Sequence, residues 1–280
     1  MRSVRATNSL RRRSILLVST ASIFYYVSTR REFLRNNSVQ DFRTVQHDKY
    51  CTQTLLRPRW THAFDYIAES AFDRSQLQPH RERETNYTWE RGNGGLDDSD
   101  RDLLANLYGS VESVFEYGLG ESTRLAAAAK LVRYSGVDSD AQYVANSRNS
   151  APSHFKFYFA DIGPTREWGN PKELLRKQSI QYQIAPLLSE LRPFDVYFVD
   201  GRFRVACVCA SILHASKFGG FESVVLMHDY KARPQYHVVE TIADVIERSQ
   251  SGNTVLLRRS KNISDERIIS VWNSFYNITA

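Results

Sequence analysis

A glycine-rich turn that follows a short apolar segment is the part of this sequence best suited to bind a ligand. It reads Glu116-Tyr117-Gly118-Leu119-Gly120-Glu121-Ser122-Thr123. Gly118 and Gly120 leave room for a tight backbone turn and for close approach of a ligand, and the first amides of the following helix would face that ligand. A dinucleotide fingerprint requires a third glycine where Thr123 stands, and Glu116 suits a cationic amino-acid group better than a pyrophosphate.

Acidic residues stand at the ends of three further apolar segments. Asp138 follows the second segment, Asp161 the third and Asp200 the fourth. In an open parallel sheet, ligands bind at the carboxyl ends of the strands, and an acid about twenty residues after the glycine turn can hold two ribose hydroxyls. Each acid alone is more often a solvated loop residue or a helix cap, but together with Glu116 they predict one ligand-binding edge.

Arginine and histidine side chains are concentrated after the fourth and fifth apolar segments. They are Arg202, Arg204, His228, Arg233 and His237. Arginine binds carboxylates and phosphates with two parallel hydrogen bonds, and either histidine could take a proton from an attacking hydroxyl. The alternative for each histidine is a structural hydrogen bond. The loop over 163–171 is interpreted as a lid or an acceptor wall, or else as an ordinary surface loop.

Alternating strands and helices must position these residues. The pattern predicts strands over 113–117, 133–137, 155–160, 196–199, 223–227 and 254–258. It predicts helices over 100–109, 122–130, 175–190, 204–216, 235–248 and 265–276. Such alternation with apolar strands is typical of a parallel sheet covered by helices on both faces. We therefore expect an α/β fold with three αβα layers and a doubly wound, mostly parallel sheet.

Three of these segments together resemble the motifs of a known family. Residues 116–123 are similar to the first motif of the class I (Rossmann-like) S-adenosylmethionine (SAM)-dependent methyltransferases, and residues 194–201 to their fourth-strand motif. Residues 225–230 resemble the fifth-strand ending of small-molecule O-methyltransferase-like relatives. The sequence departs from the family pattern at Arg202-Phe203-Arg204, and the predicted elements lack the seventh strand of the family's terminal antiparallel hairpin.

The resemblance implies a role for each strand-end residue. It assigns the methionine part of SAM to the first motif, whose cofactor-binding residues would be Glu116, Gly118, Gly120, Ser122 and Thr123. Asp138 would bind the ribose hydroxyls, Asp161 would lie near the adenine, and Asp200 would border the transferred methyl group. In the metal-dependent members, acids at the positions of Asp200 and Asp229 hold a divalent ion, and Mg²⁺ suits such oxygen ligands.

We therefore expect methyl transfer from SAM to an oxygen of a small-molecule or glycan-like acceptor. The residues expected to orient the acceptor and carry the reaction are Asp200, Arg202, Arg204, His228 and His237. Two alternatives from other functional classes stay open. One is a non-catalytic Rossmann-like binding module, and the other is a nucleotide-sugar-using transferase. The absence of an Asp-x-Asp metal motif near a nucleotide-binding strand counts against the transferase, although Asp138-Ser139-Asp140 formally has that spacing.

Positive charge is concentrated at the N-terminus. The chain has a net charge of +6, yet residues 1–36 alone carry eight arginines and one glutamate. The remainder is nearly neutral, with 29 basic and 30 acidic residues. A nucleic-acid-binding domain carries its basic face on the folded domain, so we expect no nucleic-acid partner.

Residues 14–29 form an uncharged run between arginine clusters. It is somewhat shorter than the roughly 20 residues that cross a bilayer. We interpret 1–36 as a basic segment with a signal-anchor in the membrane, 37–97 as a stem and irregular lead-in, and 98–280 as the methyltransferase-like domain. We expect this domain to face the Golgi or secretory lumen. A cleaved signal peptide and a mitochondrial or plastid transit peptide are the alternatives. Four glycosylation sequons, at Asn36, Asn86, Asn262 and Asn277, favour the lumen.

The three cysteines fit neither a zinc site nor an internal bridge. Cys207 and Cys209 are two residues apart on a predicted helix, so their side chains point in different directions. Cys51 stands far from both, and no zinc-ligand spacing is present. The prediction is that Cys207 and Cys209 are small buried apolar residues.

Overall fold

The computed structural model describes residues 62–69, 95–166 and 169–279. All of them belong to one compact unit, Arg59–Ala280. The predicted membrane anchor at 14–29 and most of the predicted stem lie outside these ranges, so both stay predictions. Among the helices in the described ranges, none combines the length and the apolar character that a bilayer crossing requires.

The centre of the fold is a seven-stranded sheet in the order β3-β2-β1-β4-β5-β7-β6. The strands are β1 (Ser113–Tyr117), β2 (Arg133–Asp138), β3 (Lys156–Phe159), β4 (Val196–Val199), β5 (Val224–Met227), β6 (Ala243–Arg248) and β7 (Val255–Arg259). The first five pair in parallel, whereas β7 is antiparallel to both β5 and β6. From β1 the sheet extends through β2 to β3 on one side and, beginning with β4, on the other, so the strand order switches direction between β1 and β4. The carboxyl ends of these two strands therefore border the place where such sheets bind ligands.

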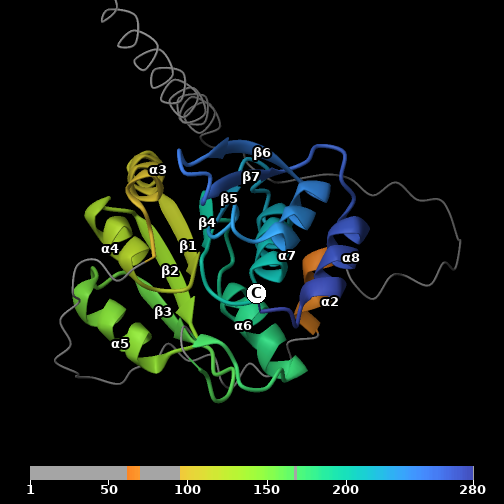
Figure 1. Ribbon diagram of the computed structural model, residues 1–280, viewed down its shortest axis with the longest axis horizontal. Helices are drawn as coiled ribbons and strands as arrows, with labels where there is room; N and C mark the ends of the chain where they lie inside the picture. Colours follow the sequence, from red (N-terminus) through yellow and green to blue (C-terminus); the bar gives the residue numbers. More distant parts are fainter. Residues whose placement is uncertain (1–61, 70–94, 167–168, 280) are drawn as a thin grey trace, which may run out of the picture. The chain divides into compact units, whose positions relative to one another are not determined.

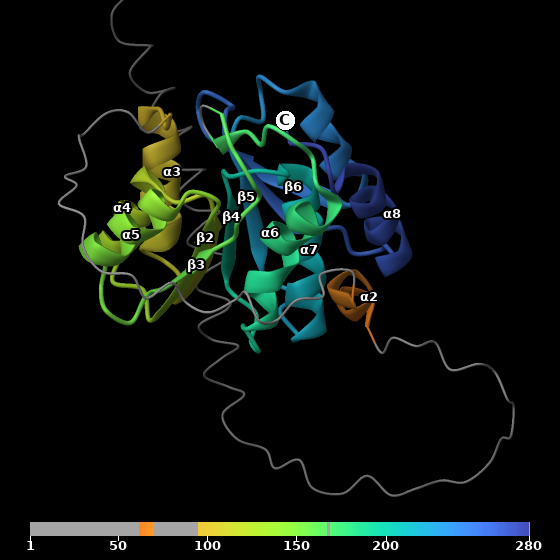
Figure 2. The ribbon, with the colours of Figure 1, turned by 90° about the horizontal axis from the view of Figure 1, so that it is seen from below.

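Helices cover both faces of the sheet, which confirms the predicted three-layer α/β architecture (Figures 1 and 2). One face carries α3 (Asp98–Tyr108), α4 (Glu121–Ala128) and α5 (Ala141–Ser150). The other face carries α2 (Ala63–Glu69), α6 (Arg176–Leu188), α7 (Arg204–Lys217) and α8 (Asp265–Phe275). Because both faces are covered, every residue of β1, β4 and β5 is buried.

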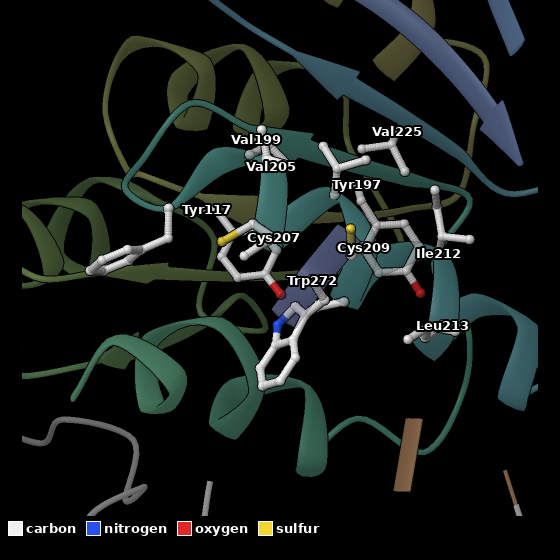
Figure 3. Close-up of a cluster of buried hydrophobic side chains, with 14 of the residues drawn as sticks. Tyr117, Tyr197, Val199, Val205, Cys207, Cys209, Ile212, Leu213, Val225 and Trp272 are labelled. Atoms are coloured by element: carbon white, nitrogen blue, oxygen red, sulfur yellow. The ribbon is translucent and has the colours of Figure 1, made fainter. Parts of the chain in front are cut away.

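Helix α7 packs against the sheet within an extensive hydrophobic cluster. Figure 3 shows Tyr117, Tyr197 and Val225 from three neighbouring strands together with Cys207 and Cys209 from α7. Both cysteines are free and fully buried, which confirms that they act as small apolar core residues.

The predicted helix over 235–248 is wrong. The structure has a 3₁₀ helix, η3 (Pro234–Thr241), and then strand β6. Burial alternates along β6, where Ala243 is buried and Asp244 is exposed, and this two-residue period is that of a strand. The segment therefore supplies the antiparallel hairpin strand that was missing from the predicted elements. A helical period in its apolar residues concealed it, because short apolar runs fit both periods.

Candidate functional site

The turns after β1 and β4 touch each other at two glycines. A Cβ on Gly118 would lie 2.8 Å from both Cα and N of Gly201, and Gly118 has a φ of +89°. Non-glycine residues rarely adopt that conformation. The Asp200 N–H also donates to the Tyr117 carbonyl at 2.9 Å. The fold itself therefore requires glycine at position 118, whatever binds there.

Gly120 differs, because no atom of the described protein crowds the place where a side chain would be. Its backbone has a φ of 171° and a ψ of −132°, and a Cβ there would meet nothing within 4 Å. Gly120 immediately precedes α4, and its N–H donates to Thr123 Oγ1 at 3.1 Å. The open space beside this glycine, at the amino end of a helix, is where a ligand would approach the backbone.

Glu116 is fully buried beneath this turn and does not face solvent. It accepts hydrogen bonds from the Tyr108 hydroxyl at 2.8 Å and from Thr123 Oγ1 at 2.9 Å, and it contacts the Tyr134 hydroxyl. Burial raises the pKa of Glu116 to about 7, although these hydrogen bonds oppose the shift. In this structure Glu116 ties β1 to α3, α4 and β2. The adjacent Ser122 and Thr123 are also buried.

Asp138 lies at the end of β2 and joins the glycine turn directly. Its Oδ2 accepts the Leu119 N–H at 2.8 Å, and its Oδ1 accepts the Asp140 N–H at 2.9 Å. Burial raises the pKa of the Asp138 carboxyl to about 6. Asp161, in contrast, is exposed after β3 and accepts the Gly163 N–H at 2.8 Å. The structure thus brings Asp138 and the glycine turn together, and it gives Asp161 the role of a turn-stabilising residue.

His228, at the end of β5, is buried between two carboxylates. Its Nδ1 lies 2.8 Å from Asp200 Oδ1, and its Nε2 lies 3.2 Å from Asp100 Oδ2. Burial alone would lower the pKa of His228, but the carboxylates of Asp200 and Asp100 outweigh it and raise the pKa to about 10. At that pKa the imidazole would carry a proton near pH 7, which disfavours its use as a base. The predicted catalytic role of His228 therefore stays a prediction.

Of the three remaining predicted catalytic residues, the structure buries Arg204 and leaves Arg202 and His237 partly or fully exposed. Arg204 is buried and paired with Asp200 and Asp229. Arg202 donates to Asn170 Oδ1 at 2.8 Å, so it joins Asn170 to the β4 turn. His237 is exposed, and its Nε2 lies 3.3 Å from the Tyr230 carbonyl.

Sequence reasoning missed Asp100 and Asn253, which complete this cluster. Asp100 is fully buried in the first turn of α3, and the Asn253 side-chain amide lies 2.8 Å from His228 Nε2. Asp100 stands 128 positions from His228 in the sequence. The only local signal was an acidic residue near the start of a helix, which ordinarily caps or faces solvent.

Comparisons with known proteins support the fold. No protein-family model and no curated protein matches the chain. Among solved structures, a methyltransferase-like protein from Silicibacter pomeroyi DSS-3 is 25% identical with a TM-score of 0.53, over 65% of this chain and 96% of that chain. The N-methyltransferase NodS from Bradyrhizobium japonicum WM9, in complex with S-adenosyl-L-homocysteine (SAH), is 11% identical with a TM-score of 0.37, over 71% of this chain and 100% of that chain. The sheet, its terminal hairpin and the strand-end motifs together show that the chain has a class I SAM-dependent methyltransferase-like fold.

Proposed function

We propose that this protein transfers a methyl group from SAM to an acceptor. The observation that carries the proposal is the open space beside Gly120 at the amino end of α4. Asp138 lies against the same turn through the Leu119 amide. A backbone that a ligand can approach closely, next to a carboxylate that accepts hydroxyl hydrogen bonds, is suited to an amino-acid group joined to a ribose.

The residues present fit SAM, and their task would be alignment. When bound, SAM supplies an activated methyl group on a sulfonium, so the reaction needs little acid–base chemistry from the protein. Asp138 would hold the ribose hydroxyls, and the glycine turn would hold the methionine part. Arg202, which holds Asn170 beside the β4 turn, would help to exclude water above the edge.

We propose a small or glycan-like acceptor that is methylated on oxygen and carries negative charge. Arg204 is unavailable to it, because this guanidinium is buried among protein groups. Arg202 and Arg233 remain; the Arg233 side chain is 30% exposed, although it also pairs with Asp229 at 3.2 Å. A guanidinium suits the two oxygens of a carboxylate or phosphate. These two arginines are the acceptor-orienting residues that we favour.

Thermal unfolding of the full-length chain with added ligands tests the proposal. A ligand at 100 times its Kd adds about 2.7 kcal/mol to the free energy of unfolding. For a domain of this size, that raises Tm by about 5–10 °C. We expect SAH and SAM to give such a shift and UDP-glucose and NAD to give none. A shift with UDP-glucose alone would support the nucleotide-sugar alternative and reject methyl transfer.

A further inference from the structure

Two carboxylates at the ends of β4 and β5 share one guanidinium. Arg204 Nη2 lies 3.1 Å from Asp200 Oδ1, and Arg204 Nη1 lies 3.0 Å from Asp229 Oδ2. These acids are the two for which the family resemblance implies a divalent ion. Together with His228 they are also close enough to coordinate one, since their ligand atoms lie within 4.8 Å of one another. Distances alone therefore do not distinguish a metal site from a protein ion pair.

The fixed position of the Arg204 side chain favours a protein ion pair over a metal site. Its side chain is 4% exposed, and besides the carboxylates it donates from Nε to the Gly201 carbonyl at 3.0 Å and from Nη1 to the His228 carbonyl at 2.7 Å. The backbone around it is held in an uncommon conformation, with φ of 55° at Phe203 and 59° at Asp229. Because this one buried guanidinium makes all four contacts, it cannot move aside for an ion without breaking them.

The two carboxylates already lie next to permanent cations of the protein. Asp200 pairs with Arg204, and Asp229 pairs with both Arg204 and Arg233. A guanidinium stays charged in proteins, so it cannot yield its place by losing a proton. A divalent ion placed between these carboxylates would bring two unbalanced charges into a largely buried site.

We infer that the guanidinium of Arg204 takes the place of a divalent cation between Asp200 and Asp229, so that this site does not use a metal. The carboxylates implied as metal ligands do not fit that role here. Arg204 instead joins both strand ends through its own guanidinium, whereas a metal would have to be acquired.

Manganese titration of the full-length protein tests this inference. Free Mn²⁺ is measured by its electron paramagnetic resonance signal, in the absence of any methyl donor, so the result does not depend on whether the protein transfers methyl groups. We expect wild type and Asp229→Asn to bind Mn²⁺ equally, with Asp98→Asn as a matched control for weak binding to exposed acids. A stoichiometric site in wild type that Asp229→Asn loses would overturn the inference.

A second experiment removes the guanidinium of Arg204. We expect Arg204→Ala to bind one Mn²⁺ at least tenfold more tightly than wild type, and the double variant Arg204→Ala/Asp229→Asn to lose that gain. Circular dichroism checks that each variant is folded. A folded Arg204→Ala protein without any gain would contradict the claim that the guanidinium fills a cation position. If Arg204→Ala does not fold, the comparison of wild type with Asp229→Asn decides the question alone.

Discussion

Alanine at each of the two glycines of the β1 turn should separate folding from binding. At Gly118, alanine would adopt a φ near +89° and place a methyl group 2.8 Å from Gly201. Left-handed backbone costs an alanine about 1–2 kcal/mol, and an overpacked methyl costs about 1–3 kcal/mol. The smaller conformational entropy of the unfolded alanine chain offsets about 0.4–1 kcal/mol of this. We therefore expect Gly118→Ala to lower the free energy of unfolding by about 1–5 kcal/mol.

At Gly120, alanine meets no steric obstacle, because the added methyl points into open space, although the φ of 171° with a ψ of −132° is a sparsely populated conformation for alanine. We expect the free energy of unfolding to fall by about 1 kcal/mol, which is less than in Gly118→Ala. The same methyl would occupy space that the ligand needs, so the affinity for SAH should fall at least tenfold, which is about 1.4 kcal/mol.

Urea unfolding followed by tryptophan fluorescence, together with SAH titration, measures both quantities for each variant. Two results would refute the reasoning. One is a Gly118→Ala protein as stable as Gly120→Ala, which would mean that the two turns do not pack as described. The other is a Gly120→Ala protein that binds SAH as wild type does, which would mean that the open space beside Gly120 is not the binding site.

Two further predictions concern the buried cluster around His228. Asp100→Ala removes one of the two carboxylates beside the His228 imidazole, so the free energy of unfolding should fall by about 3–5 kcal/mol. The control Asp98→Ala, at an exposed carboxylate, should change it by less than about 0.5 kcal/mol. Urea unfolding at pH 7 compares the two variants, and equal effects would reject the buried pair. The folded-state pKa of His228 is raised to about 10, above an unfolded value of about 6.5. Its contribution to stability is therefore complete below about pH 6.5 and is lost as pH rises towards 10. The free energy of unfolding should fall across that range in wild type and fall less in His228→Gln, and parallel curves would contradict the assignment.

The sequence allowed the parallel part of the fold to be predicted, because its strands are short apolar runs that alternate with helices along the chain. The helix predicted over 204–216 matches α7, and the glycine turn stands where the motif placed it. Strand β6 could not be identified, since its assignment depends on pairing with β7 and not on its own periodicity.

The sequence predicted where in the sheet the candidate site lies, but it did not predict which side chains pair with one another there. The strand-end acids and the arginines were found because a parallel sheet brings its carboxyl ends to one edge. Which cation meets which carboxylate depends on side-chain direction and on contacts between distant segments, such as Asp100 with His228. Arg204 illustrates the difference: it was expected to orient the acceptor, and the structure buries it against Asp200 and Asp229.

The most direct test of the central claim is isothermal titration of SAH into the full-length chain, with Asp138→Ala measured in parallel. The account predicts micromolar binding by wild type with one site per chain, and loss of that binding in a folded Asp138→Ala protein, because the carboxylate that would hold the ribose is gone. Absence of binding in wild type would leave the fold as described and contradict the proposal that this protein uses SAM.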